Sequence, residues 1–157
     1  MADKPDYIFT RDYIDNNRIP AADGHLCVAD VATGTGIWLM DLSSRVPATV
    51  QLEGLDISFQ ATPPTEWLPT NVTMRHWNIR DPVPEGLVEK YDIVHIRYLC
   101  LVLSDEEVPS VLQNVARLIK PGGYLQWGEL DTPSFRIEKT RPDNDASGLL
   151  RLYLASS

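Results

Sequence analysis

The sequence predicts an α/β fold in which a mainly parallel sheet lies between two layers of helix. Apolar runs of strand length alternate along the chain with helical or turn-rich segments, as in right-handed βαβ units. Two of these runs, residues 54–57 and 92–96, are almost continuously apolar, which is typical of strands covered on both faces. The first run leads into a small-residue turn that opens a helix, and nucleotide-like ligands bind at such turns.

Five strands are predicted. The first opens the segment 28–38, and four more are expected at 50–57, 72–79, 91–98 and 124–130. They form one domain at residues 26–131, between an N-terminal extension at 1–25 and a C-terminal tail at 132–157.

Two main helices connect the strands. An apolar stripe at 3.6-residue spacing predicts a helix at 37–46 and another at 105–119. The second has a capping box, Ser104 with Glu107, and is expected to end at the turn 120–123. Shorter helices are expected at 7–14 and 146–155, and the proline-rich segment 58–70 predicts only a short or distorted helix.

The overall composition excludes several classes of partner. A net charge of −8 over 157 residues argues against nucleic acid, since phosphate binding needs a basic surface. No stretch is apolar enough to cross a membrane, and the N-terminus does not resemble a signal peptide, so a cytoplasmic location is expected. The cysteines Cys27 and Cys100 lie in apolar runs and are expected to be buried, reduced thiols. They and the three histidines lack ligand spacing, so no metal is predicted.

The turn after the first strand separates two classes of cofactor. A dinucleotide fingerprint would continue Gly34 and Gly36 with a glycine at position 39, which is Leu39. Counting backwards gives acidic-x-small-x-Gly-x-Gly instead, from Asp30 through Ala32. The alternative is an ordinary tight turn between strand and helix.

Four later motifs follow in order. They are Asp56 at the end of the second strand, residues 76–79 after the third, residues 90–98 around the fourth, and residues 118–129 with a Pro-Gly-Gly entry into the fifth. Together with the glycine turn, this order resembles class I S-adenosylmethionine-dependent methyltransferases. The residues that make up these motifs are most similar to those of fungal secondary-metabolite methyltransferases, over about residues 26–131.

This resemblance implies a Rossmann-like three-layer sandwich with the strand order 3-2-1-4-5 and S-adenosylmethionine as cofactor. It places the turn on the amino-acid portion of the cofactor, Asp56 on the ribose and Asn78 on the adenine amine. Asp56 could instead be a turn residue or helix cap, and Trp77 a core residue. The complete set of cofactor-binding residues expected is Asp30, Ala32, Thr33, Gly34, Gly36, Asp56, Ile57, Trp77, Asn78, Ile79 and Arg97.

Methyl transfer depends mainly on positioning, and a base is needed only for a poorly acidic hydroxyl or a protonated amine. His95 and Arg97 are the candidate catalytic residues; the alternatives are a hydrogen-bonded core histidine and a salt bridge. Glu129 and Asp131, at the end of the fifth strand, line the acceptor side or are solvated strand-end carboxylates.

The function expected is methyl transfer to a small-molecule acceptor like a secondary metabolite. The alternatives are a non-catalytic cofactor-binding or regulatory module and an NAD-type dinucleotide domain. The resemblance implies a chain that is shortened at both ends relative to the family and has no room for the later strands, so weak or absent activity is expected. Without those strands the fifth strand would be an open edge, which predicts self-association.

Overall fold

The computed structural model describes residues 25–130 and the positions 141, 143, 145, 147, 148 and 151. The N-terminal extension, with its predicted helix at 7–14, lies outside the described residues apart from His25. Most of the tail, including most of the predicted helix at 146–155, lies outside them as well.

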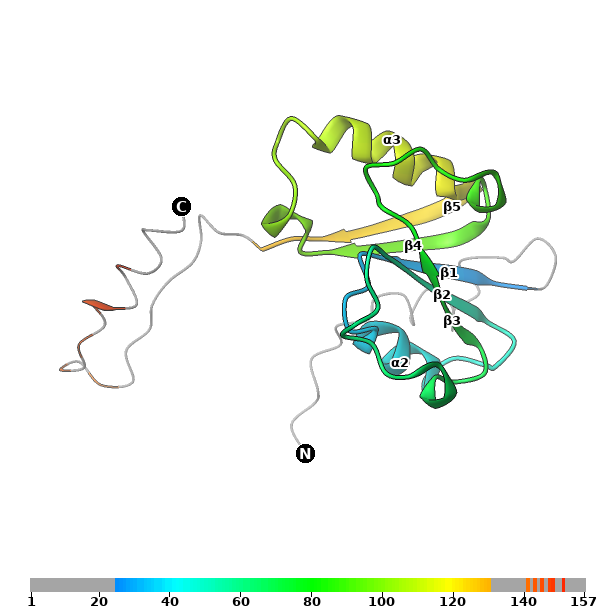
Figure 1. The fold of residues 1–157 in the computed structure, drawn as a ribbon, viewed down its shortest axis with the longest axis horizontal. Helices are drawn as coiled ribbons and strands as arrows, with labels where there is room; N and C mark the ends of the chain where they lie inside the picture. The colour runs from blue at the N-terminus through cyan, green and yellow to red at the C-terminus, as the bar shows by residue number, and fades with distance from the viewer. Residues whose placement is uncertain are drawn as a thin grey trace.

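A five-stranded, wholly parallel sheet forms the centre of the described part (Figure 1). Its spatial order is β3-β2-β1-β4-β5, which confirms the predicted topology. The strands are β1 (Cys27–Val31), β2 (Gln51–Asp56), β3 (Val72–His76), β4 (Tyr91–Arg97) and β5 (Ile119–Gly128).

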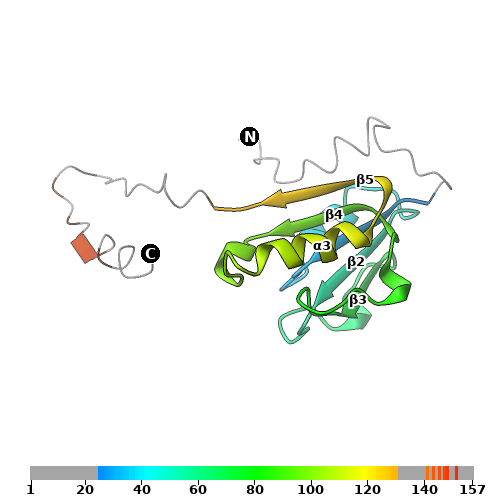
Figure 2. The ribbon, with the colours of Figure 1, turned by 90° about the horizontal axis from the view of Figure 1, so that it is seen from above.

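Two α-helices lie on opposite faces of this sheet, as Figures 1 and 2 show. These are α2 (Ile37–Ser43) and α3 (Val108–Leu118), and three short 3-10 helices complete the described elements: η1 (Thr65–Trp67), η2 (Glu85–Leu87) and η3 (Leu99–Leu101). Both α-helices are shorter than predicted. The α3 helix starts only after Glu107, and a turn at 105–107 precedes it. One bond of the predicted capping box is present, since the Ser104 N–H donates to the Glu107 carboxylate at 2.8 Å, whereas the Ser104 hydroxyl also donates to that carboxylate instead of accepting the Glu107 N–H.

Alternate residues of each inner strand enter separate cores. On one face, Val28 and Ile93 pack with Leu39 of α2, and on the other Val31 and Val94 pack in the cluster that holds the buried residues of α3. This two-sided burial is the reason that the strand sequences are almost continuously apolar.

The fifth strand starts earlier than expected. Position 119 already pairs with Tyr91, whereas Tyr124 pairs with Ile93, so the Pro-Gly-Gly segment bulges within the strand instead of preceding it. Gly123 has no room for a side chain there, since a Cβ atom would lie 2.8 Å from the Asp92 carbonyl oxygen. Gly122 adopts a φ of 84°, in the left-handed region that favours glycine.

Candidate functional site

Two adjoining cavities open where β1 to β4 end. The first, of about 280 Å³, lies beside the glycine-rich turn and is called here the turn cavity; the second, of about 230 Å³, lies beside Asp56 and is called the Asp56 cavity. Ala32, Leu99 and Val102 line both. The turn cavity is also lined by Asp30, Thr33, Gly34, Thr35, Ile37, Trp38, His95, Arg97 and Tyr98. The Asp56 cavity is also lined by Val31, Asp56, Ile57, Trp77, Asn78, Ile79 and Arg80.

The turn from β1 to α2 contains three residues with positive φ: Ala32 at 56°, Gly34 at 58° and Gly36 at 72°. Gly34 lines the turn cavity, and a Cβ atom there would meet nothing within 4 Å. Gly36 lines neither cavity, and its Cβ would lie 2.8 Å from Met74 Cε. The backbone turn and the packing against Met74 thus explain the glycine at this position, and its expected cofactor contact stays a prediction.

Ala32 occupies the small-residue position of the motif with a φ of 56°, in the left-handed region. In this region the Cβ of an L-residue lies close to the following carbonyl oxygen, which costs roughly 1–2 kcal/mol and which glycine avoids. Alanine is therefore strained at this position despite its small volume.

Asp30 lines the turn cavity and fixes the two neighbouring side chains of Thr33 and His95. Its carboxylate, 4% exposed, accepts a hydrogen bond from the Thr33 hydroxyl at 2.6 Å and lies 2.7 Å from Nδ1 of His95. The His95 ring also stacks on the indole of Trp38. His95 is thus the buried, hydrogen-bonded histidine that the sequence offered as an alternative, and it also lines the turn cavity.

Asp56 ties the glycine turn to the end of β2. Its Oδ2 accepts the Gly34 N–H at 2.8 Å, and its Oδ1 accepts the Ser58 N–H at 3.1 Å. Each carboxylate oxygen has two lone pairs, so both remain able to accept a further hydrogen bond from the cavity that the side chain lines. Ile57 follows at the rim and is 60% exposed.

The segment after β3 forms the opposite wall of the Asp56 cavity. Trp77 belongs to the core beside α3 and also lines the cavity, so the core interpretation is confirmed and the cofactor contact stays a prediction. The side-chain oxygen of Asn78 accepts the Arg80 N–H at 3.1 Å, which turns the chain sharply. Ile79 is buried, and its carbonyl oxygen accepts a hydrogen bond from the Asn114 side chain at 2.8 Å.

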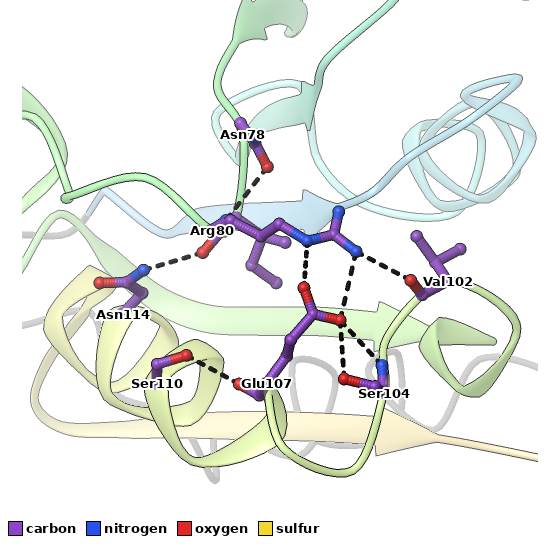
Figure 3. Close-up of polar contacts among 8 residues, drawn as sticks. Asn78, Arg80, Val102, Ser104, Glu107, Ser110 and Asn114 are labelled. Atoms are coloured by element: carbon purple, nitrogen blue, oxygen red, sulfur yellow. Dashed lines mark hydrogen bonds and ion pairs between the residues drawn. The ribbon is translucent and has the colours of Figure 1, made fainter.

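Arg80 is a wall residue that sequence reasoning missed. Its Nε donates to Oε1 of Glu107 at 2.6 Å, and its Nη2 donates to the Val102 carbonyl at 2.8 Å (Figure 3). The Arg80 guanidinium lowers the pKa of Glu107 to about 2, aided by hydrogen bonds from Ser104. No local pattern could reveal this pair, because its members lie 27 positions apart.

The ends of β4 and β5 hold three residues whose contacts the sequence did not predict. Arg97 forms no ion pair within residues 25–130; its guanidinium carbon lies 4.8 Å from the centre of the Tyr98 ring, at the wall of the turn cavity. Glu129, after β5, accepts the N–H groups of Leu99 and Cys100 at 3.0 and 3.1 Å and so holds η3, and its place on the acceptor side stays a prediction. Asp131 lies outside the described residues. Cys100 is exposed in η3, not buried in a strand.

Neither Cys27 nor Cys100 forms a disulfide within the part of the chain that the structure describes, and Cys27 is half-buried. Among the described residues there is no group of three or more histidines, cysteines or acids placed to hold a metal ion. The same part of the chain contains no helix that is both long enough and apolar enough to span a membrane.

Comparison with known proteins identifies the class to which this fold and site belong. The family described as "Methyltransferase domain" matches residues 28–123, which is more than half of the chain. The chain therefore belongs to the methyltransferase-domain family.

Its relatives include fungal enzymes. The methyltransferase grgD of a Penicillium species is 44% identical over 115 residues, covering 69% of this chain and 40% of that protein. The N-methyltransferase tcpN of Claviceps purpurea is 36% identical over 105 residues, covering 66% of this chain and 37% of that protein. The chain thus spans about two fifths of the length of these relatives.

A solved structure confirms the fold. The methyltransferase CalH, determined as a complex with SAH, superposes with a TM-score of 0.59 at 20% identity, over 74% of this chain and 35% of CalH. At this identity the likeness supports the Rossmann-like architecture alone.

Proposed function

We propose that this chain binds S-adenosylmethionine and forms the cofactor-binding part of a methyltransferase that acts on a small-molecule acceptor. The observation that carries the proposal is the pair of cavities that meet at Ala32, at the carboxyl ends of four parallel strands. A nucleoside joined to an amino acid through one sulfur atom needs two adjoining compartments of this kind. Membership of the methyltransferase-domain family supports the same ligand.

The Asp56 cavity fits the nucleoside. The carboxylate of Asp56 can accept hydrogen bonds from the two ribose hydroxyls, and the side-chain oxygen of Asn78 can accept one from the adenine amine. Trp77, Ile57 and Ile79 supply apolar surface for the purine ring.

The turn cavity fits the amino-acid portion. Ala32, Thr33 and Gly34 line it, and Asp30 holds this turn in place through the Thr33 hydroxyl. Arg97 brings a cation to the same wall, where it can bind a carboxylate. Gly36 contributes to this site by adopting the positive φ that the turn requires.

S-adenosylmethionine supplies an activated methyl group when bound. The chain then has to hold the acceptor in line with that group and exclude water, and positioning of this kind can lower a barrier by roughly 7–11 kcal/mol. His95 is the candidate to take a proton from a hydroxyl or amine acceptor, and Arg97 the candidate to orient the acceptor's charge; both line the turn cavity.

Calorimetry against S-adenosylhomocysteine and NAD tests this proposal. Binding of S-adenosylhomocysteine and no binding of NAD is expected, and NAD binding alone would establish the dinucleotide alternative. Binding of neither ligand would favour the non-catalytic module. Replacement Asp56→Ala should weaken S-adenosylhomocysteine binding by ~1.5–3 kcal/mol. Asp41→Ala, on the exposed face of α2, is the matched control.

Self-association through β5 is a further part of the proposal. This strand ends the described sheet, and Tyr124, Leu125 and Leu130 in and after it are 42%, 39% and 49% exposed. Sedimentation should detect a concentration-dependent dimer, and Leu125→Lys should weaken it. A monomer at all concentrations would contradict this expectation. The cytoplasmic location stays a prediction.

A further inference from the structure

Two loops that contribute to the wall of the Asp56 cavity are joined by one arginine. The loop after β3 carries Arg80, and the segment after β4 carries Val102 and Glu107. Arg80 bonds to both, and Figure 3 shows its guanidinium group between the Glu107 carboxylate and the Val102 carbonyl oxygen. A planar guanidinium can donate in two directions at once.

Each end of this bridge is held by further hydrogen bonds. Oε2 of Glu107 accepts from the Ser104 N–H at 2.8 Å and from its hydroxyl at 3.1 Å. On the other side, the Asn114 side chain donates to the carbonyl oxygens of Ile79 and Asp81 at 2.8 and 3.0 Å. The bridge therefore joins two segments that are each fixed locally.

Val102 is the residue on which this bridge acts most directly. It lines both cavities and is 58% exposed, so little protein covers its side chain. Its N–H donates to the Leu99 carbonyl at 2.9 Å, and its own carbonyl accepts from Arg80. Loss of the arginine would release the carbonyl end of Val102 and allow the wall between the cavities to move.

We infer that Arg80 is a positioning residue for cofactor binding, which sets the width of the Asp56 cavity by bridging Glu107 and the Val102 carbonyl. This inference rests on the proposed function, since it assigns that cavity to the nucleoside. Arg80 acts on the ligand through the wall that it holds, and its own guanidinium is engaged with protein acceptors.

The test compares Arg80→Met, Arg80→Lys, Glu107→Gln and the double variant Arg80→Met/Glu107→Gln with a matched control, Arg75→Met. Arg75 forms a similar pair with Glu53 at 2.7 Å, is 48% exposed against 40% for Arg80, and lines neither cavity. Arg80→Met should weaken the binding of S-adenosylhomocysteine and of adenosine by the same factor, about three- to tenfold. The control should bind both as the unmodified chain does.

Two of the variants separate positioning from charge alone. Arg80→Lys keeps the charge, but a single ammonium cannot reproduce the planar fork, so binding should remain weakened. The double variant should bind no more weakly than Arg80→Met, because both changes break one interaction. Unchanged affinity in Arg80→Met, full recovery in Arg80→Lys, or an equal loss in Arg75→Met would overturn the inference.

Hydrogen exchange in the ligand-free chain distinguishes failure of this inference from failure of the proposed function. The Ser104 amide should exchange faster in Arg80→Met than in the unmodified chain or in Arg75→Met, since its acceptor Glu107 has lost its anchor. If the unmodified chain binds no S-adenosylhomocysteine, the proposed function fails, and equal Ser104 exchange in all three proteins would independently overturn the bridge.

Discussion

The imidazole ring of His95 lies parallel to the indole ring of Trp38, with ring centroids 3.9 Å apart and an interplanar angle of 3°. His95 comes from β4 and Trp38 from the first turn of α2, so the stack joins the helix to the sheet. Asp30 of β1 holds the other side of the imidazole through Nδ1. Three segments distant in sequence thus meet at one wall of the turn cavity.

Removal of the Asp30 charge should destabilise the chain. The two carboxylate oxygens of Asp30 contact His95 and Thr33, and the residue is only 4% exposed. Asp30→Asn leaves one acceptor oxygen for these two contacts. The expected loss in the free energy of unfolding is ~2–4 kcal/mol, measured by urea denaturation. Asp41→Asn removes the same charge from a partly exposed pair with Arg45 and should cost less than the Asp30 change, about 1 kcal/mol or below. Equal losses of unfolding free energy in the two variants would show that the buried contacts of Asp30 contribute no more stability than the Asp41–Arg45 pair.

The two glycines of the turn should respond differently to a methyl group. Gly34→Ala and Gly36→Ala both force alanine into positive φ and should each cost ~1–2 kcal/mol of stability. Only the methyl at position 34 lies at a cavity wall, whereas that at position 36 faces Met74. Calorimetry should therefore show S-adenosylhomocysteine binding reduced at least about tenfold in Gly34→Ala and little changed in Gly36→Ala. The reverse order would place the ligand on the Gly36 side of the turn.

Ala32→Gly should stabilise the chain. Glycine at a φ of 56° removes the conflict between Cβ and the carbonyl, and this gain of ~1–2 kcal/mol exceeds the entropic cost of glycine in the unfolded chain. A net gain of ~0.5–1 kcal/mol is expected from thermal or urea unfolding. Ala29→Gly, at a fully buried position of β1, should have the opposite sign. A destabilised Ala32→Gly chain would mean that the alanine methyl makes a contact worth more than the strain.

Glu53 should make stability depend on pH in the acidic range. Burial alone would raise its pKa, but hydrogen bonds from Lys90, Tyr91 and Arg75 outweigh burial, and the pKa is lowered from 4.5. A carboxyl whose pKa is lower in the folded state stabilises the fold above its unfolded value, and that contribution disappears as the pH falls through the folded value.

The measurement is the free energy of unfolding between pH 7 and pH 3, for the unmodified chain and for Glu53→Gln. The variant should be ~2–4 kcal/mol less stable at pH 7, because Lys90 and Tyr91 lose their charged partner, and the difference should shrink below pH 4.5. A difference independent of pH would assign the effect to shape instead of charge.

Local patterns in the sequence determined the fold and the position of the site. The alternation of apolar runs with helical stripes predicted the parallel sheet, and the family resemblance of the ordered motifs implied the strand order that the structure confirms. The same motifs placed Asp56, Asn78 and the turn at one edge of the sheet, because the carboxyl ends of parallel strands meet there. The prediction of strands and helices needs only the spacing of residues along one segment, whereas the strand order came from the resemblance.

The roles of individual side chains were decided by tertiary structure. The sequence places Glu129 at the end of a strand, but only the fold shows that its carboxylate accepts a hydrogen bond from η3. The sequence likewise does not reveal that Arg80 pairs with Glu107, 27 positions away. The sequence did not predict the backbone conformation either, since the φ of Ala32 depends on how the chain turns from β1 into α2. Hydrogen bonds and φ angles of this kind follow from contacts between segments far apart in the chain, and no pattern within one segment records which contacts will form.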